Sequence, residues 1–166
     1  MATITLKGNP VTTFGELPRI GTTAPNFKLI NNSLEEITLE NYKGKKKVVS
    51  IFPSIDTPVC ATSVKKFNEA ATHLKNTVVL NVAADLPFAL KRFCSAEKIE
   101  NVFTLSTFRS HFAKDWGVEM LSSPFAGLCC RAVVILDENN KVLYTELVPE
   151  IAQEPNYDKA LTALKN

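Results

Sequence analysis

The sequence predicts an α/β fold in which a mixed β-sheet is flanked by helices, and three features of the chain support this. Short apolar runs rich in β-branched residues, at 48–52, 78–83 and 132–136, are typical of buried strands. The first two runs are each followed by a segment with helical spacing of its apolar residues. Residues 132–136 and 142–146 flank a turn sequence, so they indicate a late antiparallel hairpin. Strands that alternate with helices and end in such a hairpin are typical of an α/β sandwich.

The N-terminal part of the chain predicts short strands. Thr3 to Leu6 and Val11 to Phe14 are expected to form a hairpin around the turn sequence Lys7-Gly8-Asn9-Pro10. Two further short strands are expected, at Phe27 to Ile30 and Glu36 to Leu39. These elements precede the first buried strand.

After strand 48–52 the pattern continues with helices and strands in alternation. A first helix carries Cys60, and a second is marked by the spacing of Leu86, Leu90 and Phe93. The remaining expected elements are a short strand at Phe103 to Leu105, a brief helix from Ser110 to Trp116 with Ser110 as its candidate cap, and an amphipathic closing helix from Tyr157 to Leu164.

Composition indicates a single globular domain spanning residues 1–166, since 45% of the residues are hydrophobic and 22% are charged. The net charge of +2 provides no broad electrostatic footprint, so neither nucleic-acid nor membrane binding is expected. The basic run at 43–47 is interpreted as a solvated turn. The N-terminus lacks the features of a signal peptide, and no apolar run is long enough to span a membrane, so we expect a cytoplasmic protein.

The segment from Pro53 to Cys60 places a thiol in the first turn of a helix, directly after a buried strand. Pro53 ends the strand because it lacks the N–H donor that the sheet requires. Thr57 is a good N-cap and Pro58 suits the first helical position, so Cys60 is expected at the third. There a thiolate meets unpaired backbone donors and the positive end of the helix dipole, which favours its charged form.

The apolar spacing of this helix indicates which way the sulfur points. Residues 64, 67, 71 and 74 continue from Cys60 at helical intervals, so the thiol lies on the core-facing side. A plain buried cysteine at a helix start is the alternative interpretation, because free cysteine is among the most buried residue types. The hydroxyl of Thr57 favours a reactive thiol, since it lies close to the sulfur in this geometry and can orient a polar substrate.

Pro53, Thr57 and Cys60 form the pattern P-x-x-x-T-x-x-C, within the sequence FPSIDTPVCA at residues 52–61. In these residues the chain resembles the peroxiredoxin superfamily, and in particular its bacterial thiol peroxidase subfamily of atypical two-cysteine peroxiredoxins. The likeness continues over almost the whole chain, through the opening segment from Ile4 to Pro10 and a strand that begins after Arg131. It implies a thioredoxin-like fold with an added N-terminal β-hairpin.

The resemblance also implies a role for each matching residue. Cys60 matches the peroxidatic thiolate, and Cys94 matches the resolving cysteine. Thr57 and Arg131 match the residues that hold and polarise the peroxide, and Pro53 matches the proline of the signature. Taken by itself, the position of Arg131 also suits a surface arginine at a strand end. In the functional interpretation its fixed charge favours the thiolate and donates hydrogen bonds to the peroxide.

The remaining cysteines allow more than one interpretation. Cys94 also suits a core position on its helix, but a disulfide requires Cα atoms within about 4.4–6.8 Å, so two helical thiols must move to form one. The polar run at 95–98 predicts that the end of the Cys94 helix unfolds locally. Cys129 and Cys130 stand where the family usually has an aliphatic residue and an alanine, and they are interpreted as small packing residues.

Other classes of site fit the sequence less well. Zinc sites use closely paired cysteines, which this chain lacks apart from the adjacent pair at 129 and 130. A cysteine hydrolase requires a histidine base, and both His73 and His111 are interpreted as surface residues. A thiol-disulfide oxidoreductase has two thiols in C-x-x-C, and here Thr57 replaces the first. A non-enzymatic redox sensor or binding module is the remaining alternative.

The sequence therefore predicts a thiol-dependent peroxidase. Cys60 is expected to reduce hydrogen peroxide or an organic hydroperoxide, and Cys94 to form an intramolecular disulfide with the resulting sulfenic acid. By resemblance, thioredoxin is the expected reductant and a homodimer the expected assembly. Neither a metal nor any other cofactor is expected. The sequence does not distinguish which peroxide is preferred.

Overall fold

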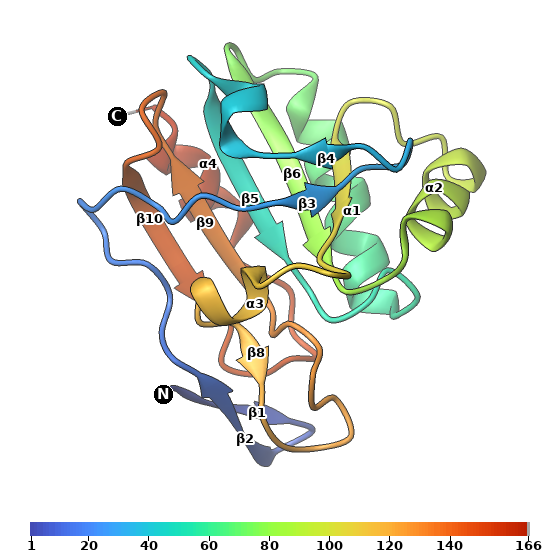
Figure 1. Cartoon of the computed structure of the whole chain (residues 1–166), viewed down its shortest axis with the longest axis vertical. Helices are drawn as coiled ribbons and strands as arrows, with labels where there is room; N and C mark the ends of the chain where they lie inside the picture. Colours follow the sequence, from blue (N-terminus) through green and yellow to red (C-terminus); the bar gives the residue numbers. More distant parts are fainter. Residues whose placement is uncertain (166) are drawn as a thin grey trace.

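The computed structural model describes residues 1–165, and its centre is a group of three parallel strands (Figure 1). β5 (Lys46–Ile51) lies beside β6 (Thr77–Ala83), which in turn lies beside β7 (Phe103–Ser106). Every residue of β5 after Lys46 is buried, as are all residues of β6 after Thr77. Burial on both faces explains why these strands are continuous apolar runs in the sequence.

Antiparallel strands extend this group at both edges. β9 (Ala132–Leu136) is antiparallel to β5, and β10 (Val142–Leu147) is antiparallel to β9. At the other edge β3 (Leu29–Ile30) pairs with β7 and with β4 (Glu36–Ile37), in both cases antiparallel. The resulting seven-stranded sheet has the order β10-β9-β5-β6-β7-β3-β4. It is mixed, as the sequence predicted.

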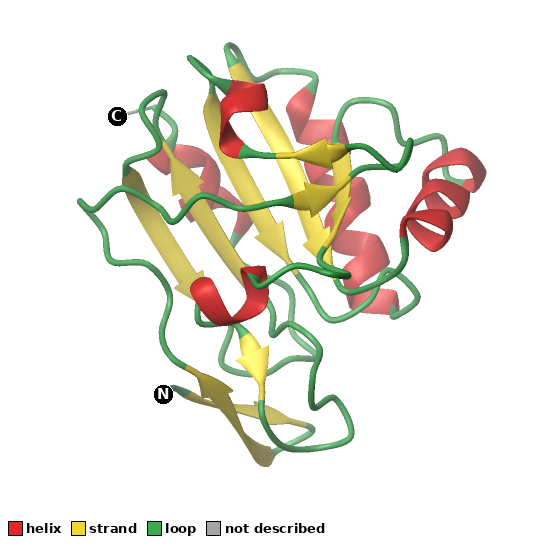
Figure 2. Ribbon diagram, in the orientation of Figure 1, coloured by secondary structure: helices red, strands yellow, loops and turns green. Residues whose placement is uncertain are grey.

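Helices flank this sheet (Figure 2). α1 (Pro58–Ala71) and α4 (Tyr157–Ala163) lie behind the sheet in the view of Figure 1, and α3 (Phe112–Asp115) lies in front. α2 (Pro87–Ala96) lies at the side where β7 runs. Buried side chains of α1, α2 and α4 share one apolar cluster with side chains of β5, β6 and β9. This cluster encloses the Cys60 side chain.

A small second sheet carries the N-terminus. β1 (Thr3–Leu6) and β2 (Asn9–Phe14) form an antiparallel hairpin, and β8 (Glu119–Met120) pairs with β2. The expected hairpin is confirmed, but its turn is shorter than predicted, because β2 already begins at Asn9. Figure 1 shows this sheet below the main sheet, on the side to which the arrows of β5 and β10 point.

Several predicted strands are shorter in the structure because side chains occupy their backbone donors. Asn26 Oδ1 accepts a hydrogen bond from Phe27 N at 2.9 Å, and β3 begins only at Leu29. Asn41 Oδ1 accepts from Thr38 N at 2.8 Å, and a 3₁₀ helix, η1 (Leu39–Tyr42), follows at once. The expected strand to Leu39 therefore ends at Ile37.

The helix boundaries differ from the prediction by a few residues. α3 begins at Phe112, and Ser110 Oγ accepts from Phe112 N at 3.2 Å although the N-cap residue is His111. α4 ends at Ala163, one residue before the predicted end. β8 and η1 were not predicted, because elements of two and four residues are too short for periodicity to reveal them. Among residues 1–165, no helix is long and apolar enough to cross a membrane.

The interpretation of residues 43–47 as a solvated turn was wrong in part. Lys43 and Lys45 are exposed, but Lys46 and Lys47 belong to β5, and the Lys47 side chain is 0% exposed. Lys47 Nζ donates a hydrogen bond to Asn140 Oδ1 at 2.6 Å, and burial lowers the pKa of its ammonium group. A long aliphatic stem lets lysine continue an apolar strand when its charged end finds a polar partner.

Candidate active site

Cys60 lies in the first turn of α1, just beyond the carboxyl end of the central strand β5. The backbone of Thr57 is extended, with φ −97° and ψ 144°, and Pro58 is the first helical residue, so Thr57 is the N-cap residue. Cys60 therefore occupies the third helical position, as predicted. Its side chain is 0% exposed and packs with Val64 and Phe67 on the apolar face of the helix.

The hydroxyl of Thr57 does not cap the helix. Thr57 Oγ1 donates a hydrogen bond to the carbonyl of Ser54 at 2.9 Å, and within residues 1–165 the N-cap residue makes no side-chain capping bond. The expectation of a capping side chain was therefore wrong, although the N-cap position was right. Because the hydroxyl proton is committed to Ser54, the lone pairs of Oγ1 are left to accept a hydrogen bond from a bound molecule.

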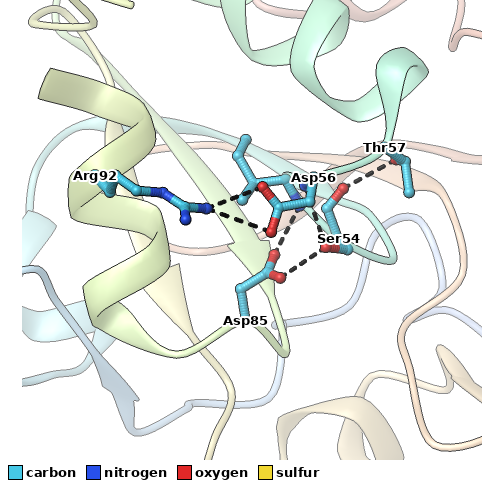
Figure 3. Close-up of polar contacts among 6 residues, drawn as sticks. Ser54, Asp56, Thr57, Asp85 and Arg92 are labelled. Atoms are coloured by element: carbon cyan, nitrogen blue, oxygen red, sulfur yellow. Dashed lines mark hydrogen bonds and ion pairs between the residues drawn. The ribbon is translucent and has the colours of Figure 1, made fainter. Parts of the chain in front are cut away.

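Asp85 fastens the loop before α1 to the end of β6 (Figure 3). One oxygen of its carboxylate accepts from Ser54 Oγ at 2.7 Å, and the other accepts from Ile55 N at 2.7 Å. Ser54 Oγ in turn accepts from Asp56 N at 3.2 Å. Hydrogen bonds to an ionised carboxylate are stronger than neutral ones, so these contacts hold the loop that carries Thr57 in one conformation.

An ion pair joins the same loop to α2. Arg92 Nη2 lies 3.1 Å from Asp56 Oδ1, and Figure 3 shows the guanidinium reaching from α2 to the loop before α1. Both side chains are largely exposed, 67% and 63%, so the pair contributes little to the stability of the fold. Its position matters more than its strength, because it connects the helix of Cys94 to the loop that precedes Cys60.

Arg131 places its guanidinium against the sulfur of Cys60. The side chain is 3% exposed; Nε donates to the carbonyl of Ile151 at 2.9 Å, and Nη2 donates to Cys60 Sγ at 3.3 Å. Nη1 is buried and has no hydrogen-bond partner among residues 1–165, and no carboxylate of these residues forms an ion pair with the guanidinium. The sulfur of Cys60 is therefore the side-chain partner of a buried cation.

A small apolar pocket lies beside this pair, with a volume of about 180 Å³. Its walls come from four parts of the chain: the hairpin, the loop before α1 together with the first turn of α1, the loop after β8 and the loop after β10. The lining residues are Leu6, Lys7, Pro53, Thr57, Pro58, Val59, Phe125, Arg131, Ile151 and Ala152. Pro53, Thr57 and Arg131 therefore line the same pocket, and their expected roles toward a substrate remain predictions.

Cys94 lies in the last turn of α2 and is partly exposed. Its sulfur is 3.6 Å from Thr104 Oγ1, and it packs against the apolar cluster that also encloses Cys60. Both thiols are free in this structure. Residues 95–98, which follow Cys94, are all exposed, and Lys98 adopts a positive φ of 54°. The end of α2 thus has few apolar contacts to lose on opening.

Cys129 and Cys130 belong to the apolar cluster on the opposite face of the main sheet. Both are 0% exposed. Burial raises the pKa of the Cys129 thiol, and it raises that of Cys130 to about 12. Protonated, inaccessible thiols of this kind are inert, which agrees with their interpretation as packing residues.

Neither histidine is placed to act as a base for Cys60. His73 lies beyond the C-terminal end of α1 and His111 is the N-cap residue of α3, and both are exposed. The interpretation of both as surface residues is confirmed. A cysteine hydrolase therefore lacks its base in this chain.

Three polar contacts of the site were not anticipated from the sequence: Asp85 with the loop, Arg92 with Asp56, and Arg131 with Ile151. The position of Asp85 could have been a signal, because this acidic residue lies two positions after the buried strand β6, which is beside the strand leading to Cys60. Nothing in the sequence points to the carbonyl of Ile151, because every residue has a backbone carbonyl.

Comparisons with known proteins identify the family. Residues 19–161 match the Redoxin family. The chain is 54% identical over 164 residues to a thiol peroxidase of Corynebacterium glutamicum and 53% identical over 164 residues to one of Mycobacterium bovis, with 99% of both chains covered in each case. The chain belongs to the thiol peroxidase subfamily of the peroxiredoxins.

Solved peroxiredoxin structures have the same fold. A peroxiredoxin-like protein from Aquifex aeolicus superposes with a TM-score of 0.94 at 41% identity, covering 99% of this chain and 96% of the other. A thiol peroxidase from Chromobacterium violaceum has a TM-score of 0.91 at 21% identity, covering 98% and 95%. The thioredoxin-like fold of this peroxiredoxin is therefore confirmed, and its class is that of a thiol-dependent peroxidase. A disulfide oxidoreductase or a redox sensor is not favoured.

Proposed function

We propose that Cys60 is the peroxidatic residue and that its thiolate attacks the terminal oxygen of a hydroperoxide. The sulfur–oxygen bond forms as the oxygen–oxygen bond breaks, so sulfur is oxidised to a sulfenic acid and the peroxide is reduced. The leaving oxygen takes up a proton and departs as water or an alcohol. The contact between Arg131 Nη2 and Cys60 Sγ at 3.3 Å is the observation that carries this proposal.

Arg131 and Thr57 have complementary roles toward the substrate. Nη1 of Arg131 is an unused buried donor, and it suits the oxygen on which negative charge develops in the transition state. Thr57 Oγ1 gives its own proton to Ser54, so toward a peroxide it acts as an acceptor for the O–H group. A donor and an acceptor at fixed positions orient the oxygen–oxygen bond toward sulfur. Pro53 contributes a buried apolar wall without an N–H group.

The apolar pocket supports an organic hydroperoxide as the preferred substrate over hydrogen peroxide. Leu6, Val59, Phe125 and Ile151 line it beside Arg131, and a volume of about 180 Å³ is more than a hydrogen peroxide molecule fills. An alkyl group that displaces water from this pocket contributes binding energy that hydrogen peroxide lacks. A lower KM for cumene hydroperoxide than for hydrogen peroxide is therefore part of the proposal.

We propose that Cys94 resolves the sulfenic acid. Its thiolate attacks the Cys60 sulfur, a disulfide forms within the chain, and the hydroxyl group leaves as water. A dithiol protein of the thioredoxin type then reduces the disulfide, which requires a reducing compartment and favours a cytoplasmic location. Following the family resemblance, we further propose that the enzyme is a homodimer, which sedimentation at equilibrium tests.

The test compares cysteine variants in a peroxide-consumption assay with a thioredoxin-type reductant. Cys60→Ser abolishes turnover and leaves no sulfenic acid after one equivalent of peroxide, as intact-protein mass spectrometry measures. Cys129→Ala is the matched control, because it removes a buried thiol on the opposite face of the sheet. It retains most of the activity. Full turnover by the Cys60 variant would show that another group reduces the peroxide.

A further inference from the structure

The guanidinium of Arg131 is aimed by one backbone carbonyl. Nε donates to the Ile151 oxygen at 2.9 Å, and this is the hydrogen bond that leaves Nη2 pointing to Cys60 Sγ and Nη1 unused. Ile151 lies in the loop between β10 and α4 and belongs to no helix or strand itself. The position of this loop therefore decides where the guanidinium points.

Glu150, the residue before Ile151, fastens this loop to the N-terminal hairpin. Its carboxylate accepts four hydrogen bonds: from Thr5 Oγ1 at 2.6 Å, Lys7 N at 2.9 Å, Gly8 N at 3.1 Å and Ala152 N at 3.2 Å. The first three donors belong to the hairpin and the last to the loop itself. One side chain thus joins two segments that lie more than 140 residues apart in the sequence, the separations being 145, 143 and 142.

The hairpin turn is shaped to receive a carboxylate. Lys7 has φ 51° and Gly8 has φ 82°, the pair of positive values that defines a two-residue type I′ turn. Its two amides converge on Glu150, and successive backbone N–H groups in a turn form a concavity that binds anions. These bonds, the one from Thr5 first, lower the pKa of Glu150 to about 2, so the carboxylate is ionised at neutral pH.

The backbone strengthens this connection. Thr5 N donates to the Pro149 carbonyl at 2.8 Å, and Ile151 N donates to the Thr5 carbonyl at 2.8 Å, which makes a short parallel bridge between β1 and the loop. The amide of Ile151 is thereby fixed by β1 while its carbonyl holds Arg131. The path from the hairpin to the Cys60 sulfur is continuous: the Glu150 carboxylate, the Ile151 carbonyl and the Arg131 guanidinium.

We propose that Glu150 is a positioning residue for peroxide reduction: by pinning the hairpin turn to the loop that follows β10, it aims the Arg131 guanidinium at Cys60 and at the peroxide. This inference rests on the proposed function. It gives the hairpin a purpose in the reaction, although residues 3–14 lie outside the segment 19–161 that matches the Redoxin family. The hairpin also supplies Leu6 and Lys7 to the wall of the apolar pocket.

The experiment measures two rate constants of Cys60 in the full-length reduced enzyme. One is sulfenic acid formation with hydrogen peroxide, and the other is alkylation by neutral iodoacetamide, which does not need the donors that orient a peroxide. Glu150→Ala lowers the peroxide rate constant by about 10-fold to 100-fold, the effect of misplacing a catalytic group by a fraction of an ångström to about 1 Å. The alkylation rate constant falls much less, so the ratio of the peroxide rate constant to the alkylation rate constant decreases.

Two milder variants and a control distinguish a positioning effect from a folding defect. Glu150→Gln keeps one acceptor oxygen, and Thr5→Val removes only the hydroxyl contact at 2.6 Å, so each lowers the ratio in the same direction by a smaller factor. Glu138→Gln removes an exposed carboxylate from the turn between β9 and β10 and leaves the ratio unchanged. Circular dichroism confirms that each variant is folded.

A double-mutant cycle with Arg131 decides between positioning and general structural support. If Glu150 acts through the guanidinium, Glu150→Ala has no further effect on the peroxide rate constant of the Arg131→Ala enzyme. The inference would be overturned if the two substitutions lowered the peroxide rate constant independently, so that their factors multiply in the double variant. It would also be overturned if the Glu150 variants had the wild-type ratio of rate constants. A wild-type enzyme that forms no sulfenic acid would instead overturn the proposed function, so the two failures are distinguishable.

Discussion

The three nitrogens of the Arg131 guanidinium have three different environments. Nε is held by the Ile151 carbonyl, Nη2 contacts the Cys60 sulfur, and Nη1 is unused. The planar fork fixes these donors relative to one another, whereas an ammonium group is a single point of charge on a flexible stem. We therefore expect that a positive charge without this fork does not replace Arg131.

A lysine at position 131 tests this distinction. Arg131→Lys keeps a positive charge near sulfur but loses the fixed fork, so we expect sulfenic acid formation to slow by about 10²-fold to 10³-fold, as when one transition-state donor is removed. Stopped-flow measurement with hydrogen peroxide checks this, and the ultraviolet absorbance of the thiolate shows that the charged form persists. A lysine variant as fast as the wild type would reduce the role of Arg131 to its charge.

For single residues, the sequence predicts the placements that depend on near neighbours in the chain. Cys60 and Thr57 are three residues apart, and their placement follows from the proline and the helix start that they share. Arg131 depends on contacts across 71 residues, so its role followed only from the resemblance. Glu150 contacts the hairpin across still larger separations, and an exposed-looking glutamate in a loop carries no signal of that partner.

The proposed mechanism requires α1 to stay in place and α2 to move. α1 must keep its first turn in place, and its buried residues Cys60, Ser63, Val64 and Phe67 anchor it against the sheet. α2 buries only Pro87 and Leu90, and it must move if the Cys94 sulfur is to reach Cys60. The ion pair between Arg92 and Asp56 joins α2 to the loop before α1.

Removing this ion pair is expected to speed resolution without affecting peroxide attack. An exposed ion pair contributes about 0–1 kcal/mol, so Arg92→Ala raises the rate of disulfide formation after oxidation by at most about fivefold. Lys91→Ala is the matched control, since Lys91 is an exposed cation on the same helix that forms no ion pair within residues 1–165. Rapid quenching with an alkylating agent separates the two steps. Slower resolution in the Arg92 variant would mean that the pair guides closure instead.

The elements that the sequence predicted well are those with a long apolar pattern or clear boundary residues. β5, β6 and β9 are buried on both faces, and α1 begins at its proline. The short strands β3 and β4 were placed but overextended, because the side chains of Asn26 and Asn41 take backbone donors that a longer strand needs. Strand propensity does not reveal such local competition by side chains for backbone donors.

For the whole molecule, the sheet provides a rigid base for a reaction that needs one flexible part. Cys60 lies in the helix that follows β5, and Arg131 directly precedes β9. The two come close because β5 and β9 are paired and Ile51 lies opposite Ala132. This pairing was not predictable from spacing, since the order of strands in a sheet depends on contacts between distant segments. The family resemblance predicted the thioredoxin-like fold but no strand order.

This division of the molecule predicts where oxidation loosens the structure. A disulfide between Cys60 and Cys94 requires a short separation of their Cα atoms, and Cys60 belongs to a helix whose inner face is fully packed. The end of α2 opens instead, since residues 95–98 are exposed and bury little apolar surface. Amide hydrogen exchange in the oxidised enzyme is therefore faster across residues 90–98, while β5, β6 and β9 keep the protection they have in the reduced enzyme.

The Cys94→Ser variant separates this opening from oxidation itself. It consumes one equivalent of peroxide and stops as a Cys60 sulfenic acid, which further peroxide converts to the sulfinic acid because no thiol condenses with it. Since no disulfide pulls on α2, exchange across 90–98 in this oxidised variant stays at the reduced level. Equal protection of the wild-type segment in both redox states, or a Cys60 disulfide with Cys129 or Cys130 in peptide mass spectrometry, would contradict a mechanism in which α2 alone unfolds and the sheet remains intact.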